Sequence, residues 1–187
     1  AASGLPLQAI RHDGRELTFL IARPNRTAPP GGFAVVIGLH GGGRGDAESA
    51  ATAQGFHRMN AGEPVLVVYP NGIGAEWNDG RGQTFTRDGD LHADDVGFLS
   101  ALIDHLIAYE GADPDRIYLT GASNGAMMTH RAGCELSHKL ASIAPVIAPM
   151  PANIAPACDP ARPLPVLMIL GEDDPWVPFD GGEVTPL

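Results

Sequence analysis

The chain has 187 residues, 44% of them hydrophobic and 18% charged, with a formal net charge of -10 at pH 7. This composition is typical of one globular domain, so we expect residues 1–187 to form a single domain. The 22 acidic residues outnumber the 12 Lys and Arg residues. That balance argues against nucleic acid as a partner, because phosphate binding needs clustered positive charge, and it suits neutral substrates. No apolar run approaches the roughly 20 residues of a membrane-spanning helix, so no membrane partner is expected.

The first half of the chain predicts strands that alternate with a helix. Residues 16–22 have strand composition, and residues 33–39 form an almost wholly apolar run typical of a strand covered on both faces. A helical stretch at about 47–59 leads to a second buried strand at 65–69. Residues 72–91 are rich in Gly, Asn and Asp, which predicts a long loop, and loops of that length are usually functional.

The second half continues the alternation. Asp94 opens an amphipathic helix that Gly111 closes, and a strand at 116–120 runs directly into a helix that extends to about residue 136. Two more apolar strands follow, at 143–148 and 165–170. Strands that alternate with helices predict a doubly wound, mostly parallel α/β sheet with helices on both faces.

The strongest chemical signal is the sequence Gly-Ala-Ser-Asn-Gly at 121–125, a G-x-S-x-G placed between a strand and a helix. Glycines two residues before and after Ser123 permit a sharp, strained turn that lifts its hydroxyl clear of the sheet. The following helix offers backbone N–H groups to an oxyanion. A solvated serine in a glycine-rich turn is the alternative, and the position between strand and helix favours a nucleophile.

A second signal is His40-Gly41-Gly42-Gly43, which follows an earlier strand. Hydrolases place the other half of the oxyanion hole there, because residues without side chains let backbone N–H groups approach a developing negative charge. A nucleotide phosphate loop is the competing interpretation. It fails because the sequence has no G-x-x-x-x-G-K-[ST] motif, and no lysine lies nearby.

The third signal is an acidic turn just after the last apolar strand. In a Ser, acid, His chain order, Asp174 is the expected triad acid, with Asp173 and then Glu172 as weaker choices. The alternatives are a solvated acidic turn and a weak calcium site. Serine esterase chemistry needs no cofactor, and none is predicted.

These motifs together resemble the secreted polyhydroxybutyrate depolymerase and feruloyl esterase family of α/β-hydrolases, and the resemblance covers nearly the whole chain. It rests on residues 39–43 (LHGGG), 77–78 (WN), 94–98 (DDVGF), 115–125 (DRIYLTGASNG) and 174–178 (DPWVP). Members are extracellular or periplasmic serine esterases that act on polyhydroxyalkanoates or on feruloyl and acetyl esters of plant polysaccharides.

The resemblance implies particular roles. Ser123 corresponds to the nucleophile and Asp174 to the triad acid. Asn124 and the Gly41-Gly42 stretch correspond to the oxyanion donors. A final group of three corresponds to substrate-binding positions near the acyl pocket: Trp77, Asn78 and Trp176.

The cysteines and the N-terminus bear on location. Cys134 and Cys158 lack the paired short spacing of a zinc site, so no metal is predicted, and the residues alone leave a disulfide and two free thiols equally open. The resemblance favours the disulfide. It also implies secretion, and the small residues at the start suit a mature chain whose signal peptide has been removed.

Three departures from the family pattern blur the substrate while leaving the reaction class intact. Leu170 replaces a histidine, Glu172-Asp173 replaces small residues, and Ala126 replaces a second glycine.

The sequence lacks an evident general base. All seven histidines precede Asp174, whereas this fold delivers its base from a loop after one further strand; His92, in the long loop, is the one substitute considered. We therefore expect a C-terminal segment carrying the last strand, the histidine and the final helix to lie outside this sequence. Two rivals to the esterase remain, a catalytically silent binding module and a serine peptidase on the same fold.

Overall fold

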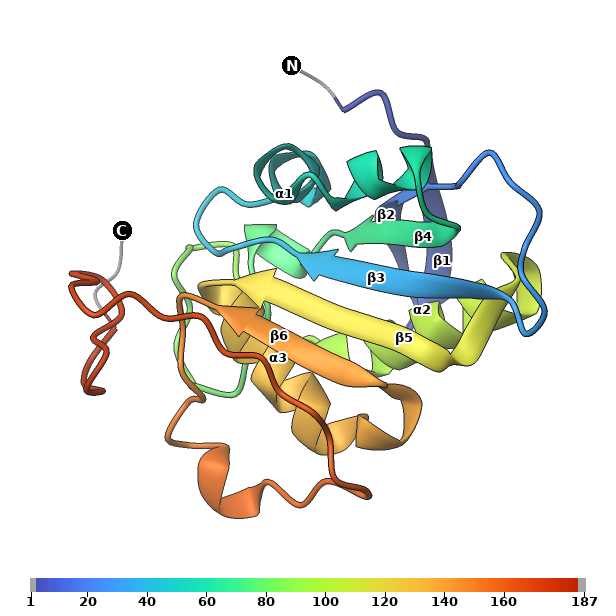
Figure 1. Cartoon of the computed structure of the whole chain (residues 1–187). Coiled ribbons are helices and arrows are strands. Elements are labelled where there is room, and N and C mark those ends of the chain that lie inside the picture. The colour runs from blue at the N-terminus through green and yellow to red at the C-terminus, as the bar shows by residue number, and fades with distance from the viewer. Residues whose placement is uncertain (1–2, 185–187) are drawn as a thin grey trace.

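A computed structural model describes residues 3–184 and shows a six-stranded sheet packed between helices (Figure 1). Short 3-10 turns complete the connections. The strands are β1 (Leu7–His12), β2 (Arg15–Ala22), β3 (Phe33–Leu39), β4 (Val65–Pro70), β5 (Ala112–Ala122) and β6 (Ser142–Val146). The helices are α1 (Ala47–Gln54), α2 (Asp95–Tyr109) and α3 (Asn124–Glu135), and the 3-10 turns are η1 (Phe56–Ala61), η2 (Ile73–Ala75), η3 (Ser137–Lys139) and η4 (Ala155–Ala157).

The strand order is β1-β2-β4-β3-β5-β6. β1 pairs antiparallel with β2 and β2 antiparallel with β4, whereas the pairs β4–β3, β3–β5 and β5–β6 are parallel. β3 and β5 are therefore neighbours, and the loops that follow their carboxyl ends meet at one edge of the sheet. This places the glycine-rich loop after β3 beside the serine turn after β5.

The helices cover both faces of the sheet, as the sequence predicts. Alternate residues of the central strands point to opposite faces, so Val35 and Ile37 pack in the larger core with α2 and α3. Val67 and Tyr69 point the other way and pack against the alanines of α1. The predicted doubly wound, mostly parallel α/β architecture is confirmed.

Helix boundaries follow from their caps. The Asp94 side chain accepts a hydrogen bond from the Gly97 N–H at 2.9 Å and starts α2 where the sequence places it. The helix expected at 47–59 is wrong in extent, because Gly55 adopts φ 66° and ends α1 at Gln54. A 3-10 turn, η1, takes up the following residues.

Two strand predictions need correction. β1 was not anticipated, because it is an edge strand in which half-buried residues alternate with exposed ones. Residues 165–170 do not form a full strand: they run beside β6 with only two isolated parallel bridges, Ile143 to Val166 and Val146 to Ile169. This segment has no partner on its outer side within the described residues, so its apolar side chains stay about half exposed.

Cys134 near the end of α3 and Cys158 just after η4 form a disulfide, as the resemblance implied. The bond fastens the irregular segment after β6 to α3 and closes a chain separation of 24 residues. Among residues 3–184, no helix has both the length and the apolar composition needed to cross a bilayer.

Candidate active site

Ser123 lies at the turn between β5 and α3, with φ 54° and ψ -121°. Residues other than glycine rarely adopt a positive φ, and such a conformation costs on the order of 1–3 kcal/mol. The flanking glycines are required by close packing, since a Cβ on Gly121 would collide with the Gly125 carbonyl oxygen. A Cβ on Gly125 would collide with the His40 carbonyl oxygen. The G-x-S-x-G pattern thus satisfies both the strained turn and the tight contact with the loop after β3.

A cleft of about 280 Å³ opens above Ser123. The Gly41-Gly42 loop forms one wall, because a Cβ on Gly41 would lie only 3.7 Å from the Ser123 Cβ, and one on Gly42 only 3.2 Å from the Asn124 Cβ. The remaining lining is mostly apolar. It comprises Phe85, Ile147, Asp174, Trp176, Val177 and Val184.

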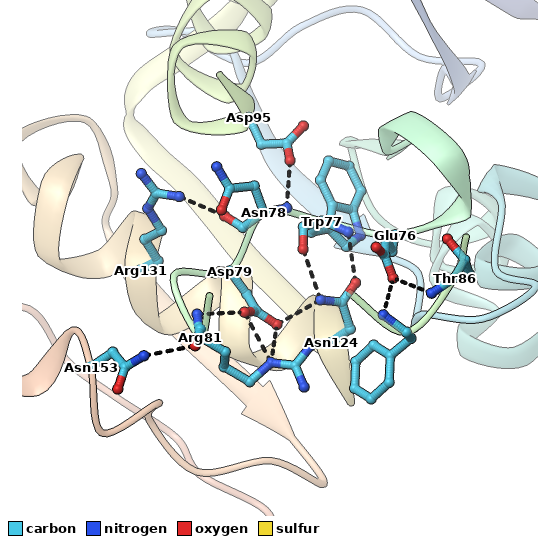
Figure 2. Close-up of polar contacts among 11 residues, drawn as sticks. Glu76, Trp77, Asn78, Asp79, Arg81, Thr86, Asp95, Asn124, Arg131 and Asn153 are labelled. Carbon is cyan, nitrogen blue, oxygen red and sulfur yellow. Dashed lines mark hydrogen bonds and ion pairs between the residues drawn. The ribbon is translucent and has the colours of Figure 1, made fainter. Parts of the chain in front are cut away.

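Asn124 is completely buried, and its side chain joins α3 to the long loop (Figure 2). Its Oδ1 accepts the Trp77 N–H at 2.7 Å, and its Nδ2 donates to the Trp77 carbonyl oxygen at 2.9 Å and to Asp79 Oδ2 at 2.6 Å. As the first residue of α3, Asn124 also has a backbone N–H with no acceptor inside the helix. The carboxamide therefore fixes the residue whose backbone N–H is the expected oxyanion donor.

Trp77 also connects the long loop to the Gly41-Gly42 loop. Its indole Nε1–H donates to the His40 carbonyl oxygen at 3.0 Å, immediately before Gly41. The His40 ring, 4.9 Å from the Trp77 ring, accepts the Gly72 N–H at Nε2, so Nδ1 carries the proton and donates to the Gly41 carbonyl oxygen at 2.7 Å. Burial lowers the pKa of His40, which keeps the ring neutral. His40 thus holds the backbone of the Gly41-Gly42 loop in place.

Asp79 and Arg81 form an ion pair behind Asn124, with 2.8 Å between Asp79 Oδ2 and Arg81 Nε. Asp79 is only 2% exposed. Burial raises the pKa of the Asp79 carboxyl, whereas the Arg81 guanidinium and the Asn124 amide oppose the shift. The guanidinium also lies over the Phe85 ring, 4.0 Å from its centroid, and so connects the ion pair to the cleft wall.

A buried carboxylate holds the next part of the loop. Asp95, at the start of α2, accepts the Asn78 N–H at 2.7 Å, and the Asn78 carbonyl oxygen accepts from Arg131 of α3 (Figure 2). Burial raises the pKa of Asp95 to about 6, and its hydrogen bond from Asn78 works against that rise. Trp77 and Asn78 are thus backbone anchors beneath the cleft, and neither is among its lining residues.

Asp174 lies in the cleft with Ser123. Its Oδ1 accepts the N–H groups of Trp176 at 2.8 Å and Val177 at 3.0 Å, which closes the acidic turn. These bonds, that from Val177 first, lower the pKa of the Asp174 carboxyl. Asp174 is therefore an anion at neutral pH, as the orienting acid of a triad must be.

None of the seven histidines lines the Ser123 cleft formed by the described residues. His12 pairs with Asp94, His57 contacts Tyr69, and His105 packs against Phe19. His92 lies in an exposed turn of the long loop. Within residues 3–184, no three His, Cys, Asp or Glu side chains gather closely enough to share a metal ion.

Four cleft residues were not predicted from the sequence as site residues, namely Phe85, Ile147, Val177 and Val184. Phe85 is positioned by Glu76, a buried carboxylate whose Oε2 accepts the N–H of Phe85 at 2.7 Å. Ile147 follows β6 with φ 57°, a strained conformation for a β-branched residue. A positive φ leaves no mark on the sequence at an isoleucine, so only the structure reveals it.

The sheet order, the strained serine turn and the glycine loop beside it define an α/β-hydrolase. A family model described as Phospholipase/Carboxylesterase matches residues 32–186, and the chain belongs to this family. The fold predicted from sequence and the resemblance to esterases are thereby confirmed.

Individual relatives and a solved structure also carry esterase names. NocK of Nocardia uniformis subsp. tsuyamanensis, which carries an esterase name, is 34% identical over 168 residues, covering 89% of this chain and 47% of NocK. Feruloyl esterase B of Piromyces equi is 36% identical over 124 residues, covering 63% of this chain and 22% of that protein. A solved thermostable esterase has the same fold, with a TM-score of 0.69 at 20% identity over 95% of this chain and 49% of that one. The chain thus spans about half or less of the length of these relatives.

Proposed function

We propose that this chain carries the nucleophile and oxyanion hole of a carboxylic-ester hydrolase that works through an acyl-enzyme on Ser123. The observation that carries the proposal is the strained turn that holds Ser123 in a cleft beside the Gly41-Gly42 loop. Ser123 Oγ attacks the ester carbonyl carbon, and its proton passes through a base to the departing alcohol. Water then attacks the acyl-enzyme and releases the acid.

The oxyanion of each tetrahedral intermediate accepts hydrogen bonds from the backbone N–H of Asn124 and from the Gly41-Gly42 stretch. These donors are fixed in advance by the buried contacts of Asn124 and Trp77, so little reorganisation accompanies the reaction. Loss of one such donor typically raises the barrier by about 3–4 kcal/mol.

Asp174 is proposed as the acid that orients the base. Because none of the seven histidines is among the lining residues of the cleft, we propose that the base is a histidine encoded outside these 187 residues. It would accept the Ser123 proton at one ring nitrogen and donate to Asp174 from the other. No cofactor enters this mechanism.

The proposed substrates are neutral esters with an apolar or aromatic acyl group, since Phe85, Ile147 and Trp176 line the cleft. Polyhydroxyalkanoates and feruloyl or acetyl esters meet this description, and the names of the relatives support the latter two. The disulfide supports the further proposal that the protein is secreted, because such bonds persist in oxidising compartments.

The test uses a fluorophosphonate probe and short p-nitrophenyl esters. The complete product of the gene should be labelled at Ser123 and should hydrolyse these esters, and Ser123→Ala should abolish both. The 187-residue chain alone should be slower by on the order of 10⁴-fold or more, the usual cost of a missing triad member. If it matches the complete product, the base lies within the chain and His92→Ala becomes the decisive variant.

The absence of a histidine from the described cleft favours one second candidate, a catalytically silent module that binds esters without cleaving them. This candidate predicts ester binding by the complete gene product without turnover and without labelling of Ser123.

A further inference from the structure

Ile147 is strained for a reason that the proposed function leaves open. Among residues 3–184, four residues other than glycine have a positive φ, and two of them line the same cleft, Ser123 at 54° and Ile147 at 57°. Such a conformation is a rare outlier for a β-branched residue, whereas glycine adopts it at no steric cost. The strain at Ser123 belongs to the nucleophile turn, but the mechanism above gives Ile147 no task.

The backbone around Ile147 is fixed by contacts with three separate segments. The Val146 carbonyl oxygen accepts the Ser123 N–H at 3.1 Å. The Ile147 N–H donates to the Ile169 carbonyl oxygen at 2.7 Å. Ala148, the next residue, is completely buried in a small cluster with residues of α3. Strained conformations persist where the surroundings determine them in this way, so the side chain of Ile147 is presented at a fixed place.

That place is directly beside the nucleophile. In the parallel pairing of β5 with β6, Ala122 is opposite Val146. The next residues, Ser123 and Ile147, therefore lie side by side where the two strands end (Figure 1), and neighbouring strands are about 4.8 Å apart. On the other side of β5, β3 leads into the Gly41-Gly42 loop. Ser123 thus lies between a wall without side chains, which the oxyanion faces, and a wall formed by a branched side chain.

Core packing is a weak reason for an isoleucine at this position. Within the described residues, Ile147 is 41% exposed and belongs to none of the apolar core clusters. Ile143 of the same strand is only 4% exposed and packs in the larger core. A side chain that is nearly half exposed gains only part of the burial free energy of a core isoleucine. The cleft, rather than the core, is where the side chain of Ile147 has a use.

We propose that Ile147 is a specificity-determining residue, which admits acyl groups unbranched at the carbon next to the carbonyl and excludes those branched there. The acyl group stays bonded to Ser123 through both half-reactions, whereas the alcohol leaves the cleft, so a fixed wall beside Ser123 acts on the acyl group. With the oxyanion at the Gly41-Gly42 side, a branch at that carbon meets the Ile147 side chain. This inference deepens the proposed function and rests on it for the acyl-enzyme.

Two isomeric esters, p-nitrophenyl butyrate and p-nitrophenyl isobutyrate, test this selection, because they share an alcohol and differ only in the position of one methyl group. The ratio of their kcat/KM values is measured for the complete product of the gene and for two variants. In Ile147→Ala the ratio should fall by about 10-fold or more, the usual value of one methyl group in a pocket, mainly because the isobutyrate ester reacts faster. Ile147→Val, which removes a single methyl group, should lower the ratio by a smaller factor.

A matched control makes the same change on the same strand, at a side chain that packs in the core: Ile143→Ala. It should lower the melting temperature more than Ile147→Ala does, and it should leave the preference for the butyrate ester unchanged. A second control varies the alcohol. The ratio of kcat/KM for ethyl butyrate to that for isopropyl butyrate should be the same in Ile147→Ala as in the unchanged protein.

The outcomes separate the two proposals. If the preference for the butyrate ester survives in both Ile147 variants, or falls equally in Ile143→Ala, selection by Ile147 is refuted and the esterase proposal stands. If Ile147→Ala does not fold, the ratio in Ile147→Val decides. If the ratio for the two alcohols changes and the ratio for the two acyl groups does not, the assignment of Ile147 to the acyl group is overturned. If the complete product hydrolyses none of the four esters, both proposals fail.

Discussion

Replacing Asn124 by aspartate changes one atom of the buried connection between α3 and the long loop, and it should make stability depend on pH. The new carboxylate would keep the acceptor for the Trp77 N–H but lose the two donated bonds of the amide. It would also stand where Nδ2 now lies, 2.6 Å from Asp79 Oδ2. Two carboxylates so close share one proton, so the pKa of the pair rises in the folded state.

The magnitude follows from the proton that the folded pair retains. A usual aspartate has a pKa of about 3.9, and each pH unit above it corresponds to about 1.4 kcal/mol. Keeping the shared proton in the folded state therefore lowers the free energy of unfolding by up to about 5 kcal/mol at pH 7.5 and by about 2 kcal/mol at pH 5.5. A raised carboxyl pKa stabilises the fold at low pH, and that stabilisation is lost as pH rises. The deficit of Asn124→Asp relative to the unchanged protein should therefore grow by about 2–3 kcal/mol between these pH values.

Urea unfolding at pH 5.5 and 7.5 measures this deficit. The double variant Asn124→Asp with Asp79→Asn is the control, because it restores one amide and one carboxylate, and its deficit should be nearly equal at both pH values. Unfolding of the single variant at pH 7.5 with folding at pH 5.5 also meets the expectation. A deficit that is the same at both pH values would refute the reasoning.

Three further predictions concern stability. Replacing Cys134 and Cys158 by alanine should lower the free energy of unfolding by about 3.5 kcal/mol on the chain-entropy model, measured in urea against the oxidised protein, and a loss under 1 kcal/mol would contradict this. In the unchanged protein the free energy of unfolding should fall by up to about 3 kcal/mol between pH 4 and pH 6.5, because the raised pKa of Asp95, about 6, makes its ionised form costly in the folded state. Asp95→Asn should remove this fall, and an equal fall in the variant and the unchanged protein would count against the prediction. Gly125→Ala should destabilise by at least about 1 kcal/mol in thermal unfolding, since the new Cβ meets the His40 carbonyl oxygen, whereas an unchanged or raised melting temperature would show that the turn yields.

The sequence predicted the parts of the site that depend on local backbone geometry. Ser123 needs glycines on both sides of its turn, and the loop at Gly41-Gly42 needs residues without side chains. Both requirements appear as short motifs. Their meeting was predictable as well, because the carboxyl ends of neighbouring parallel strands share one edge of the sheet.

The remaining features depend on contacts between distant segments. The carboxamide of Asn124 contacts Trp77 and Asp79, which are 47 and 45 residues away in the sequence. Nothing near Trp77 in the sequence shows that its backbone groups bind the Asn124 side chain of α3. The position of Phe85 in the cleft wall likewise depends on the hydrogen bond from its backbone N–H to the buried Glu76. Residues 165–170 have strand composition, yet they form only isolated bridges to β6. Composition alone does not supply a second strand to pair with their outer side, and none lies there among the described residues.

The strained torsion angles of Ser123 affect which substitutions at this position would be tolerated during evolution. Glycine adopts φ 54° more easily than serine, so Ser123→Gly should relieve part of the strain and make the fold more stable. In a protein that did not need the Ser123 hydroxyl, the substitution Ser123→Gly would therefore not be opposed by a loss of folding stability. The side chain that strains the turn is thus also the proposed nucleophile, so the proposed function sets stability and activity against each other at a single position.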